Sequence, residues 1–425
     1  MKKLLVLGAG VEKSKGIDMP LANELVPQIR DFLYNKEIGQ NVDKALRKII
    51  KGLRFSYDDF IKKAIDKLAS EFKKEVNTII YSVNKAKQND KLTEEDNKLA
   101  DIILNLLGKI QKLQTDVQLD EETVQLILEV FNDISISDES IVDLGRLSFS
   151  DTFEIVMKRI LEKSIDEPNH NVLKHIYKNL MDIENLLLKH FIGFYNENET
   201  DIKKYLYISW TLWAYLVWKE KEVYNADPNK IPFYSKLPEN IEIITFNYTS
   251  FAMKYNKESK YFHGNLSKYI RLDNRGESEI DDYNNLNIVG FIENIVNENI
   301  DFTSNRYVIP SIIPPLRLKP VLSNNFIKIW YESVKTIENS DKIIIAGYSF
   351  NYADEHFNDL IRKNKEKKIT IIDPNTSNIV NNIKRIFAYS EDDYTKNTIQ
   401  NKKSFEAGNL KIIEALATEI ELNEL

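Results

Sequence analysis

Four short apolar segments, each followed at once by small or polar residues, constrain the fold of this 425-residue chain more than any other feature. They lie at residues 4–7, 241–245, 342–346 and 369–372. Continuous runs of aliphatic and β-branched residues are typical of strands that are buried on both faces of a sheet. Helical periodicity follows the first and third segments, so we predict βα units, and hence a parallel sheet in an α/β fold.

The residues that follow the four strands carry the chemistry of the predicted sheet edge. They are Gly8-Ala9-Gly10, Thr245-Phe246-Asn247, Gly347-Tyr348-Ser349 and Asp373-Pro374-Asn375. The carboxyl ends of parallel strands meet at one edge, which is where open α/β sheets bind nucleotides. Each group alone is a weak signal, because strand-end Asp and Ser residues are often only helix caps.

The first strand runs into a glycine turn and then into a helical pattern over residues 21–33. Such an arrangement is typical of a phosphate cradle, because glycine permits close backbone approach and a helix N-terminus favours an anion. The dinucleotide fingerprint G-x-G-x-x-G is absent, since Lys13 stands where the third glycine belongs. Gly16 and Ile17 follow instead.

Asn247 and His263 form the candidate reactive pair. Asn247 follows the strand at 241–245, and we expect His263 on a second short aromatic strand, with Gly264 behind it to let another backbone or a ligand approach. An amide and an imidazole brought together can orient a sugar hydroxyl and a water. The alternative is a core strand with a turn asparagine and an ordinary histidine.

The middle of the chain is predicted to be largely α-helical. Helical periodicity recurs at residues 102–113, 122–131, 153–161, 172–191 and 202–224, with little glycine or proline. Ser56 with Asp59 and Thr93 with Asp96 have the spacing of capping boxes. We therefore predict an α-helical insertion domain at 36–239 within an α/β domain formed by 1–35 and 240–425. The aromatic residues between 205 and 218 are predicted to form core or a subunit interface, which would make the protein a homo-oligomer.

Composition excludes several classes of function. The net charge of -7 argues against a broad nucleic-acid surface. The absence of cysteine excludes disulfides, thiolate catalysis and cysteine zinc sites, and no His/Asp/Glu cluster has metal-site spacing, so we expect no metal. No apolar run reaches the ~20 residues that a membrane span needs. We expect a cytoplasmic protein without a membrane segment.

Six short motifs, in the same order as in the family, resemble the sirtuin superfamily. They are G-A-G-V-E-K-S-K-G-I at 8–17, I-T-F-N-Y-T at 244–249, F-H-G at 262–264, I-P-P at 313–315, A-G-Y-S-F at 346–350 and I-I-D-P-N at 371–375. The resemblance is closest to the sirtuin-like branch found in bacterial anti-phage defence. AbiH-like defence proteins share the F-N-Y-T and H-G patterns and are a related possibility. The helical middle of the chain lies outside the resemblance.

This resemblance implies a Rossmann-like NAD-binding fold and a set of site residues. Asn247 matches the catalytic asparagine, which holds the nicotinamide ribose and a water, and His263 matches the general base. The positions that would contact NAD+ are Gly8, Ala9, Gly10, Val11, Gly16, Thr245, Gly347, Ser349 and Asp373. The implied activity is that of an NAD+ glycohydrolase that depletes NAD+ during infection, with NAD+ as substrate.

Departures from the deacetylase pattern narrow the implied activity. The zinc-ribbon cysteines are missing, Asp18-Met19-Pro20-Leu21 replaces P-D-F-R, and T-F-N-Y-T replaces T-Q-N-I-D. These changes weaken the interpretation as an NAD-dependent protein deacylase and fit the NAD-hydrolysing branch. A nucleotide-sensing module that controls a partner without turnover remains the main alternative. In similar defence systems the sirtuin-like subunit works with a second protein, often an ATPase, so such a partner is expected.

Overall fold

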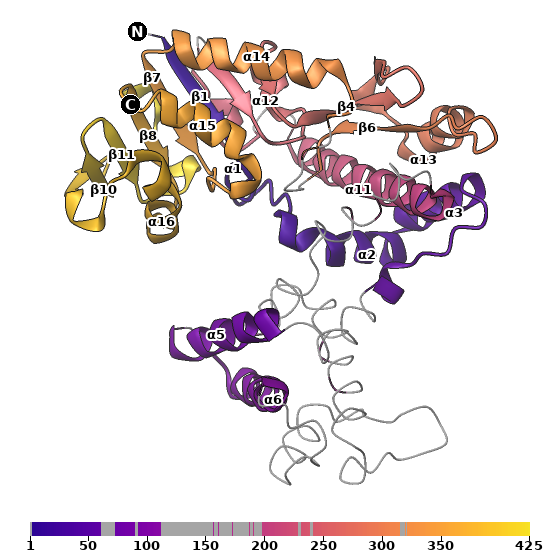
Figure 1. Ribbon diagram of the computed structural model, residues 1–425, viewed down its shortest axis with the longest axis horizontal. Coiled ribbons are helices and arrows are strands. Elements are labelled where there is room, and N and C mark those ends of the chain that lie inside the picture. The colour runs from indigo at the N-terminus through magenta and orange to yellow at the C-terminus, as the bar shows by residue number, and fades with distance from the viewer. Residues whose placement is uncertain are drawn as a thin grey trace. The chain divides into compact units, whose positions relative to one another are not determined.

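The computed structural model describes residues 2–60, 73–89, 92–111, 198–227, 231–238, 241–314, 319 and 321–425, with Val156, Ile160, Val172, Leu187 and His190. The chain divides into two compact units, drawn together in Figure 1. The first contains Met1–Leu21, Asn35–Leu53 and Glu184–Leu425, and the second contains Ala22–Tyr34 and Arg54–Ile183. The predicted helix at 122–131, and nearly all of those at 153–161 and 172–191, lie outside the described residues.

An eight-stranded sheet forms the framework of the first unit, in the order β3-β2-β1-β7-β8-β11-β10-β9. Its strands are β1 (Lys3–Leu7), β2 (Glu242–Thr245), β3 (Lys260–Tyr261), β7 (Lys342–Ala346), β8 (Lys368–Ile372), β9 (Thr395–Ile399), β10 (Lys402–Ala407) and β11 (Leu410–Ile413). Pairing is parallel from β3 to β11, and only β10 and β9 add antiparallel strands at one edge. The predicted α/β class with a mostly parallel sheet is confirmed, and the arrangement is compatible with a Rossmann-like fold.

β1 and β7 lie next to each other in the sheet, and the strands that follow each of them along the chain are added on opposite sides. β1 pairs with β2 on one side, with Leu5 opposite Ile243, and with β7 on the other, with Leu5 opposite Ile344. The prediction that residues 4–7 and 241–245 share a sheet is therefore confirmed. The chain continues outward from β2 to β3 on one side and from β7 through β8 to β11 on the other. The strand order reverses between β1 and β7, and a ligand crevice of a doubly wound sheet forms at such a point.

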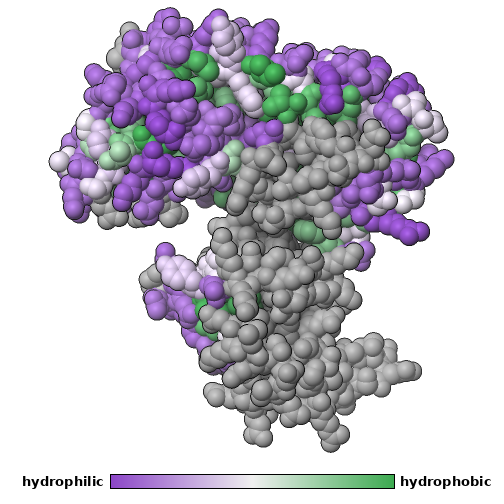
Figure 2. All heavy atoms as spheres, viewed as in Figure 1, coloured by the Kyte–Doolittle hydropathy of each residue, from purple (hydrophilic) through white to green (hydrophobic). Residues whose placement is uncertain are grey.

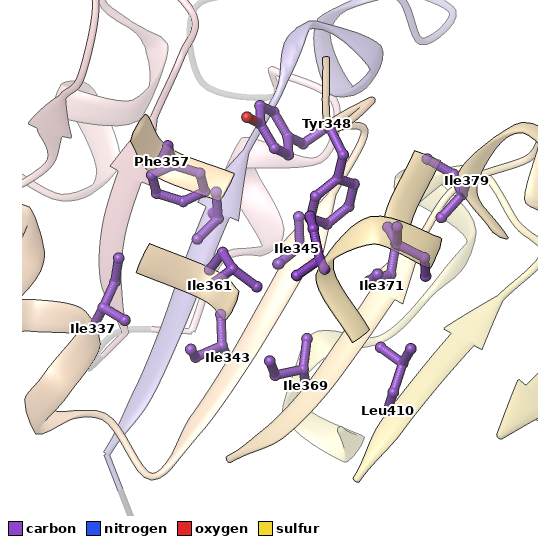
Figure 3. Packing of buried hydrophobic residues seen from close by; sticks show 14 of the residues in the cluster. Ile337, Ile343, Ile345, Tyr348, Phe357, Ile361, Ile369, Ile371, Ile379 and Leu410 are labelled. Carbon is purple, nitrogen blue, oxygen red and sulfur yellow. The ribbon is translucent and has the colours of Figure 1, made fainter. Parts of the chain in front are cut away.

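Helices cover one face of this sheet through a shared apolar core. In Figure 3, Ile343 and Ile345 of β7 and Ile369 of β8 face Ile361 of α15 (Glu355–Lys363). Side chains from α14 (Asn324–Asn339) and α16 (Thr376–Phe387) join the same cluster. Ile344, which points to the opposite face, is equally buried. Burial on both faces explains why these strands are continuously apolar.

A second, three-stranded sheet packs with the longest described helix. The strands are β4 (Gly264–Arg271), β5 (Glu277–Glu279) and β6 (Val308–Ile312), in the antiparallel order β5-β4-β6. The helix is α11 (Glu199–Ala226), which confirms the helix predicted at 202–224. Trp210 Nε1 donates to the carbonyl of Val308 at 3.0 Å, and Trp213 Nε1 donates to that of Leu266 at 2.8 Å. The other α-helices that the structure describes in this unit are α1 (Ala9–Glu12), α3 (Glu37–Ile49), α12 (Phe251–Tyr255) and α13 (Ile288–Phe291).

The aromatic residues of α11 are core of a single chain. Tyr205, Tyr207, Trp210, Trp213 and Tyr215 are at most 2% exposed. Their burial therefore needs no second subunit, because α11 packs against α3, β4, β6 and α13 of the same chain. The burial of these residues in one chain removes this argument for a homo-oligomer, which stays a prediction.

The second unit contains the helices α2 (Leu25–Asn35), α5 (Lys73–Asn89) and α6 (Glu94–Gln111). The capping box predicted at Thr93 and Asp96 is confirmed by reciprocal hydrogen bonds of 3.1 and 3.2 Å. α3 and α11, which the sequence assigned to the helical insertion, belong to the unit that contains the sheets. The reason is that α11 packs against β6 and α3 packs against α11.

Figure 2 shows a mostly hydrophilic face over the described residues, with the apolar residues in small separate areas. Within the described part of the chain, no helix combines the length and the apolar character needed to cross a bilayer.

Candidate functional site

The loops after β1 and β7 interlock at the point where the strand order reverses. Gly8 N–H donates to the carbonyl of Ala346, and Gly10 N–H donates to that of Gly347, both at 2.9 Å. A Cβ on Gly8 would lie 2.4 Å from the Gly347 oxygen, and a Cβ on Gly347 would lie 2.4 Å from the Val11 nitrogen. Gly347 also has a φ of +60°, which a side chain rarely adopts. Contact between the two loops therefore requires these glycines.

The interlock changes how the predicted phosphate cradle can work. The N–H groups of Gly8 and Gly10 are used by the β7 loop, and that of Val11 donates to the Gly8 carbonyl at 3.1 Å. Ala9 is exposed at the first position of α1, so its N–H is the group of this turn best placed for a ligand. Gly16, also exposed, has a φ of +94° and follows α1 in a turn.

Asn247 is held in one orientation at the end of β2. Its backbone N–H donates to Thr245 Oγ1 at 3.1 Å, and its Nδ2 donates to the carbonyl of Gly8 at 3.2 Å and to the hydroxyl of Tyr234 at 3.4 Å. The residue is only 6% exposed. No described residue donates to its Oδ1. The amide therefore keeps its acceptor oxygen for a ligand.

A buried carboxyl group, that of Glu12, is connected to Asn247 through the hydroxyl of Tyr234. Glu12 Oε1 accepts from the hydroxyls of Tyr234 and Thr249, each at 2.6 Å. Burial raises the pKa of Glu12 to about 7, although the hydrogen bonds from Thr249 and Tyr234 oppose the shift. Ser250, which follows Thr249 in the chain, contacts a second buried carboxyl group, that of Glu220. Its backbone N–H donates to Glu220 Oε1 at 3.0 Å, and its hydroxyl donates to the same oxygen. Burial raises the pKa of Glu220 as well.

His263 lies in the turn directly after β3, and the expectation that it lies on a strand is wrong by two residues. β3 ends at Tyr261, and β4 starts at Gly264 with a φ of +80°. A Cβ on Gly264 would lie 2.1 Å from the carbonyl oxygen of Ser311, so the predicted close backbone approach is confirmed. The His263 ring packs edge-on against Phe246 with ring centroids 4.9 Å apart.

Two charged residues surround the His263 imidazole. Nε2 lies 3.0 Å from Asp354 Oδ1, and Lys319 Nζ lies 3.1 Å from the same oxygen. Neither His263 Nε2 nor Asp354 Oδ1 has a well-directed hydrogen bond, so their contact is electrostatic. Burial, and then the charge of Lys319, lower the pKa of His263. Although burial opposes it, the charges of His263 and Lys319 hold the pKa of Asp354 below its usual range. His263 is therefore neutral near pH 7.

The remaining predicted residues lie at the exposed part of the same sheet edge. Ser349 is exposed, and its carbonyl accepts from Asn382 Nδ2 at 2.8 Å. Asp373 is half-buried, which raises its pKa, and its Oδ1 accepts from the N–H of Asn375 at 2.8 Å. Asp373 thus makes a local turn contact of the kind expected for a capping residue, while its other carboxylate oxygen is not used in that contact.

Sequence reasoning missed four residues around the predicted pair. Tyr234 contacts Asn247 and Asp354 contacts His263, while Glu12 binds Tyr234 and Lys319 binds Asp354. Glu12 lies in the first helical turn after the glycines, where an acidic residue resembles an ordinary favourable charge at a helix N-terminus. Asp354 precedes α15 and resembles a helix cap. His356, the weaker histidine candidate, is exposed on α15, and its ring stacks on that of Phe262 and packs at a tilt against that of Trp330.

A pocket of about 530 Å³ opens beside the site without containing any of the predicted residues. Its lining includes Ser250 and Tyr283, which both bind Glu220, and the lysines 257, 260 and 268. Glutamates 258, 279 and 332 balance these lysines. Among the residues described, no group of three or more His, Asp or Glu side chains is arranged to hold a metal ion.

Comparison with known proteins leaves the family unassigned. No protein-family model, no curated protein and no solved structure gives a significant match to the chain. The assignment of function therefore rests on the geometry of Asn247, His263 and the interlocked glycine loops.

Proposed function

We propose that the protein is a sirtuin-like NAD+ glycohydrolase, which cleaves the nicotinamide–ribose bond and depletes NAD+ in anti-phage defence. The observation that carries the proposal is the hydrogen bonding of the Asn247 side-chain amide. Both hydrogens of its amide are directed to protein acceptors, and its oxygen is left for a ligand at the end of a central parallel strand. That position adjoins the place where doubly wound sheets bind nucleotides.

Cleavage of the nicotinamide–ribose bond does not need a general acid, because nicotinamide is a good leaving group without protonation. Breaking the C1′–N bond passes through an oxocarbenium-like state, and nicotinamide leaves as a neutral molecule with the bonding electron pair. A water oxygen then forms the new bond to C1′ and loses a proton. The enzyme has to orient the ribose and the water and to keep other water out. Asn247 Oδ1 accepts from a ribose hydroxyl or from the water in this scheme.

His263 takes the proton in the same scheme. Its lowered pKa keeps it neutral and able to accept a proton near pH 7. The carboxylate of Asp354, 3.0 Å away, stabilises the imidazolium that forms. Lys319 limits this stabilisation, because its positive charge opposes protonation of His263.

The exposed part of the edge would hold the rest of NAD+. Ser349 and the N–H of Ala9 are polar groups at the ends of β7 and β1, where the phosphates would lie. Asp373, at the end of β8, suits a ribose diol, because a carboxylate can accept from two hydroxyls. Gly347 would support this edge indirectly, because it lets the β7 loop contact the backbone of the β1 loop.

The proposal is tested by incubating the purified protein with NAD+ and separating the products by chromatography. Formation of nicotinamide and ADP-ribose in equal amounts is expected, and Asn247→Ala should slow it about 10²- to 10⁴-fold. Tight NAD+ binding without products would favour the sensor, and products formed only with an acylated peptide would favour the deacylase. A constitutive NADase would kill its host, so we also propose that assembly or a second defence protein such as an ATPase gates the activity. The incubation should therefore be repeated with the product of the neighbouring gene.

A further inference from the structure

The direction of the Asn247 amide depends on a proton that another residue controls. The hydroxyl of Tyr234 has one proton, and it donates that proton to Glu12 Oε1 at 2.6 Å. The same hydroxyl can then only accept from Asn247, whose Nδ2 lies 3.4 Å away. If the amide turned over, its Oδ1 would face two oxygens, those of Tyr234 and Gly8, without a proton between them.

We infer that Glu12, acting through the hydroxyl of Tyr234, is a positioning residue that fixes the Asn247 amide with its oxygen toward the ligand. Glu12 is 3% exposed and Tyr234 is fully buried, so water does not compete for these hydrogen bonds. Leaving either partner unsatisfied would cost the desolvation of a buried polar group. The catalytic consequence rests on the proposed NAD+ hydrolysis, whereas the orientation itself does not.

The chain offers a matched pair of variants for this inference. Tyr234 and Thr249 both donate a hydroxyl to Glu12 Oε1 at 2.6 Å, but only Tyr234 contacts Asn247. Tyr234→Phe and Thr249→Val each remove one such hydroxyl and keep the shape of the side chain. A purely structural role of the Glu12 cluster predicts equal effects of the two substitutions.

Kinetics give the first readout. Tyr234→Phe should lower kcat for nicotinamide release about 10- to 100-fold with little change in KM, because misplacement of a catalytic group costs that much. Thr249→Val should stay within about threefold of the wild type for the same folded amount, since it leaves the Asn247 contacts intact. Glu12→Gln should retain most of the activity of the wild type, because the glutamine Oε1 can still accept from Tyr234. Equal loss in Tyr234→Phe and Thr249→Val, in step with their melting temperatures, would overturn the inference.

Neutron crystal structures of the two variants give a readout that does not need turnover, because they distinguish the deuterated amide nitrogen from the amide oxygen. The expected result is one orientation of the Asn247 amide in Thr249→Val and both orientations in Tyr234→Phe. A single, unchanged amide orientation in Tyr234→Phe would overturn the inference even if the wild type hydrolysed NAD+. If the wild type shows no turnover, the NADase proposal fails, and the structures still decide whether Tyr234 orients Asn247.

Discussion

Asn247 and His263 are almost equally buried, at 6% exposure each, yet their surroundings differ in kind. Asn247 is fixed by directed hydrogen bonds that it donates to a carbonyl, a tyrosine hydroxyl and a threonine hydroxyl. His263 lies among charges, with Asp354 and Lys319 close by but without well-directed hydrogen bonds. Directed bonds determine where an atom points, whereas nearby charges determine how strongly a group binds a proton. The first environment suits a positioning group and the second suits a base.

The largest effect should come from removing the positioning group. Asn247→Ala should lower kcat about 10²- to 10⁴-fold, because orientation of the ribose and the water is lost. Combining it with His263→Ala should cost little more than either change alone, since groups that act on one step are not additive. Rates of nicotinamide release from the four proteins test this. Multiplicative losses would show that the two regions serve separate steps.

The carboxyl behind Asn247 should make stability depend on pH. Because the pKa of Glu12 is raised to about 7 in the folded protein, the folded state binds a proton that the unfolded state has released. The free energy of unfolding should therefore fall by about 3 kcal/mol as the pH rises from about 4.5 through 7. Glu12→Gln should lack this part of the decline. Urea unfolding of both proteins at several pH values isolates Glu12, and parallel curves would contradict the assignment.

The charges around His263 should shift the acid side of the pH–rate profile in opposite directions. Activity requires neutral His263, so it should fall only below the usual histidine pKa. Lys319→Met removes a charge that lowers the pKa of His263, and the acid limb should move to higher pH. Asp354→Asn removes a charge that raises it, and the limb should move to lower pH. Profiles of kcat/KM that shift the same way in both variants would break the distinction between the two regions.

The smallest effect is expected at the exposed part of the edge. Ser349→Ala removes one hydroxyl that is accessible to solvent in the free protein, so the loss should be about 1 kcal/mol of binding, or roughly fivefold in KM, with kcat unchanged. Initial rates over a range of NAD+ concentrations measure both constants. A fall in kcat larger than the change in KM would place Ser349 nearer the reacting atoms than proposed.

The parallel strands could be predicted because burial on both faces leaves continuous apolar runs such as Lys342–Ala346. β9 could not, because its first four residues are polar and exposed and show no alternation. Asn247 and His263 could be put forward as candidates from the sequence because they follow apolar segments. Glu12 and Tyr234 are in contact although they lie 222 residues apart in the sequence, and no local sequence pattern predicts such a contact. The glycines were predicted for the approach of a phosphate, but the space that a side chain would need at Gly8, Gly10 and Gly347 is filled by contact between the two loops.

A matched pair of histidines tests the central claim most directly. His190 is 5% exposed, and its Nδ1 lies 2.8 Å from Asp201 Oδ1, so it resembles His263 and Asp354 in burial and charge. His190→Ala and His263→Ala should both lower the melting temperature, but only His263→Ala should reduce nicotinamide release per folded molecule, by about 10²- to 10⁴-fold. Full NAD+ turnover by well-folded His263→Ala protein, or equal losses in the two variants, would contradict the account.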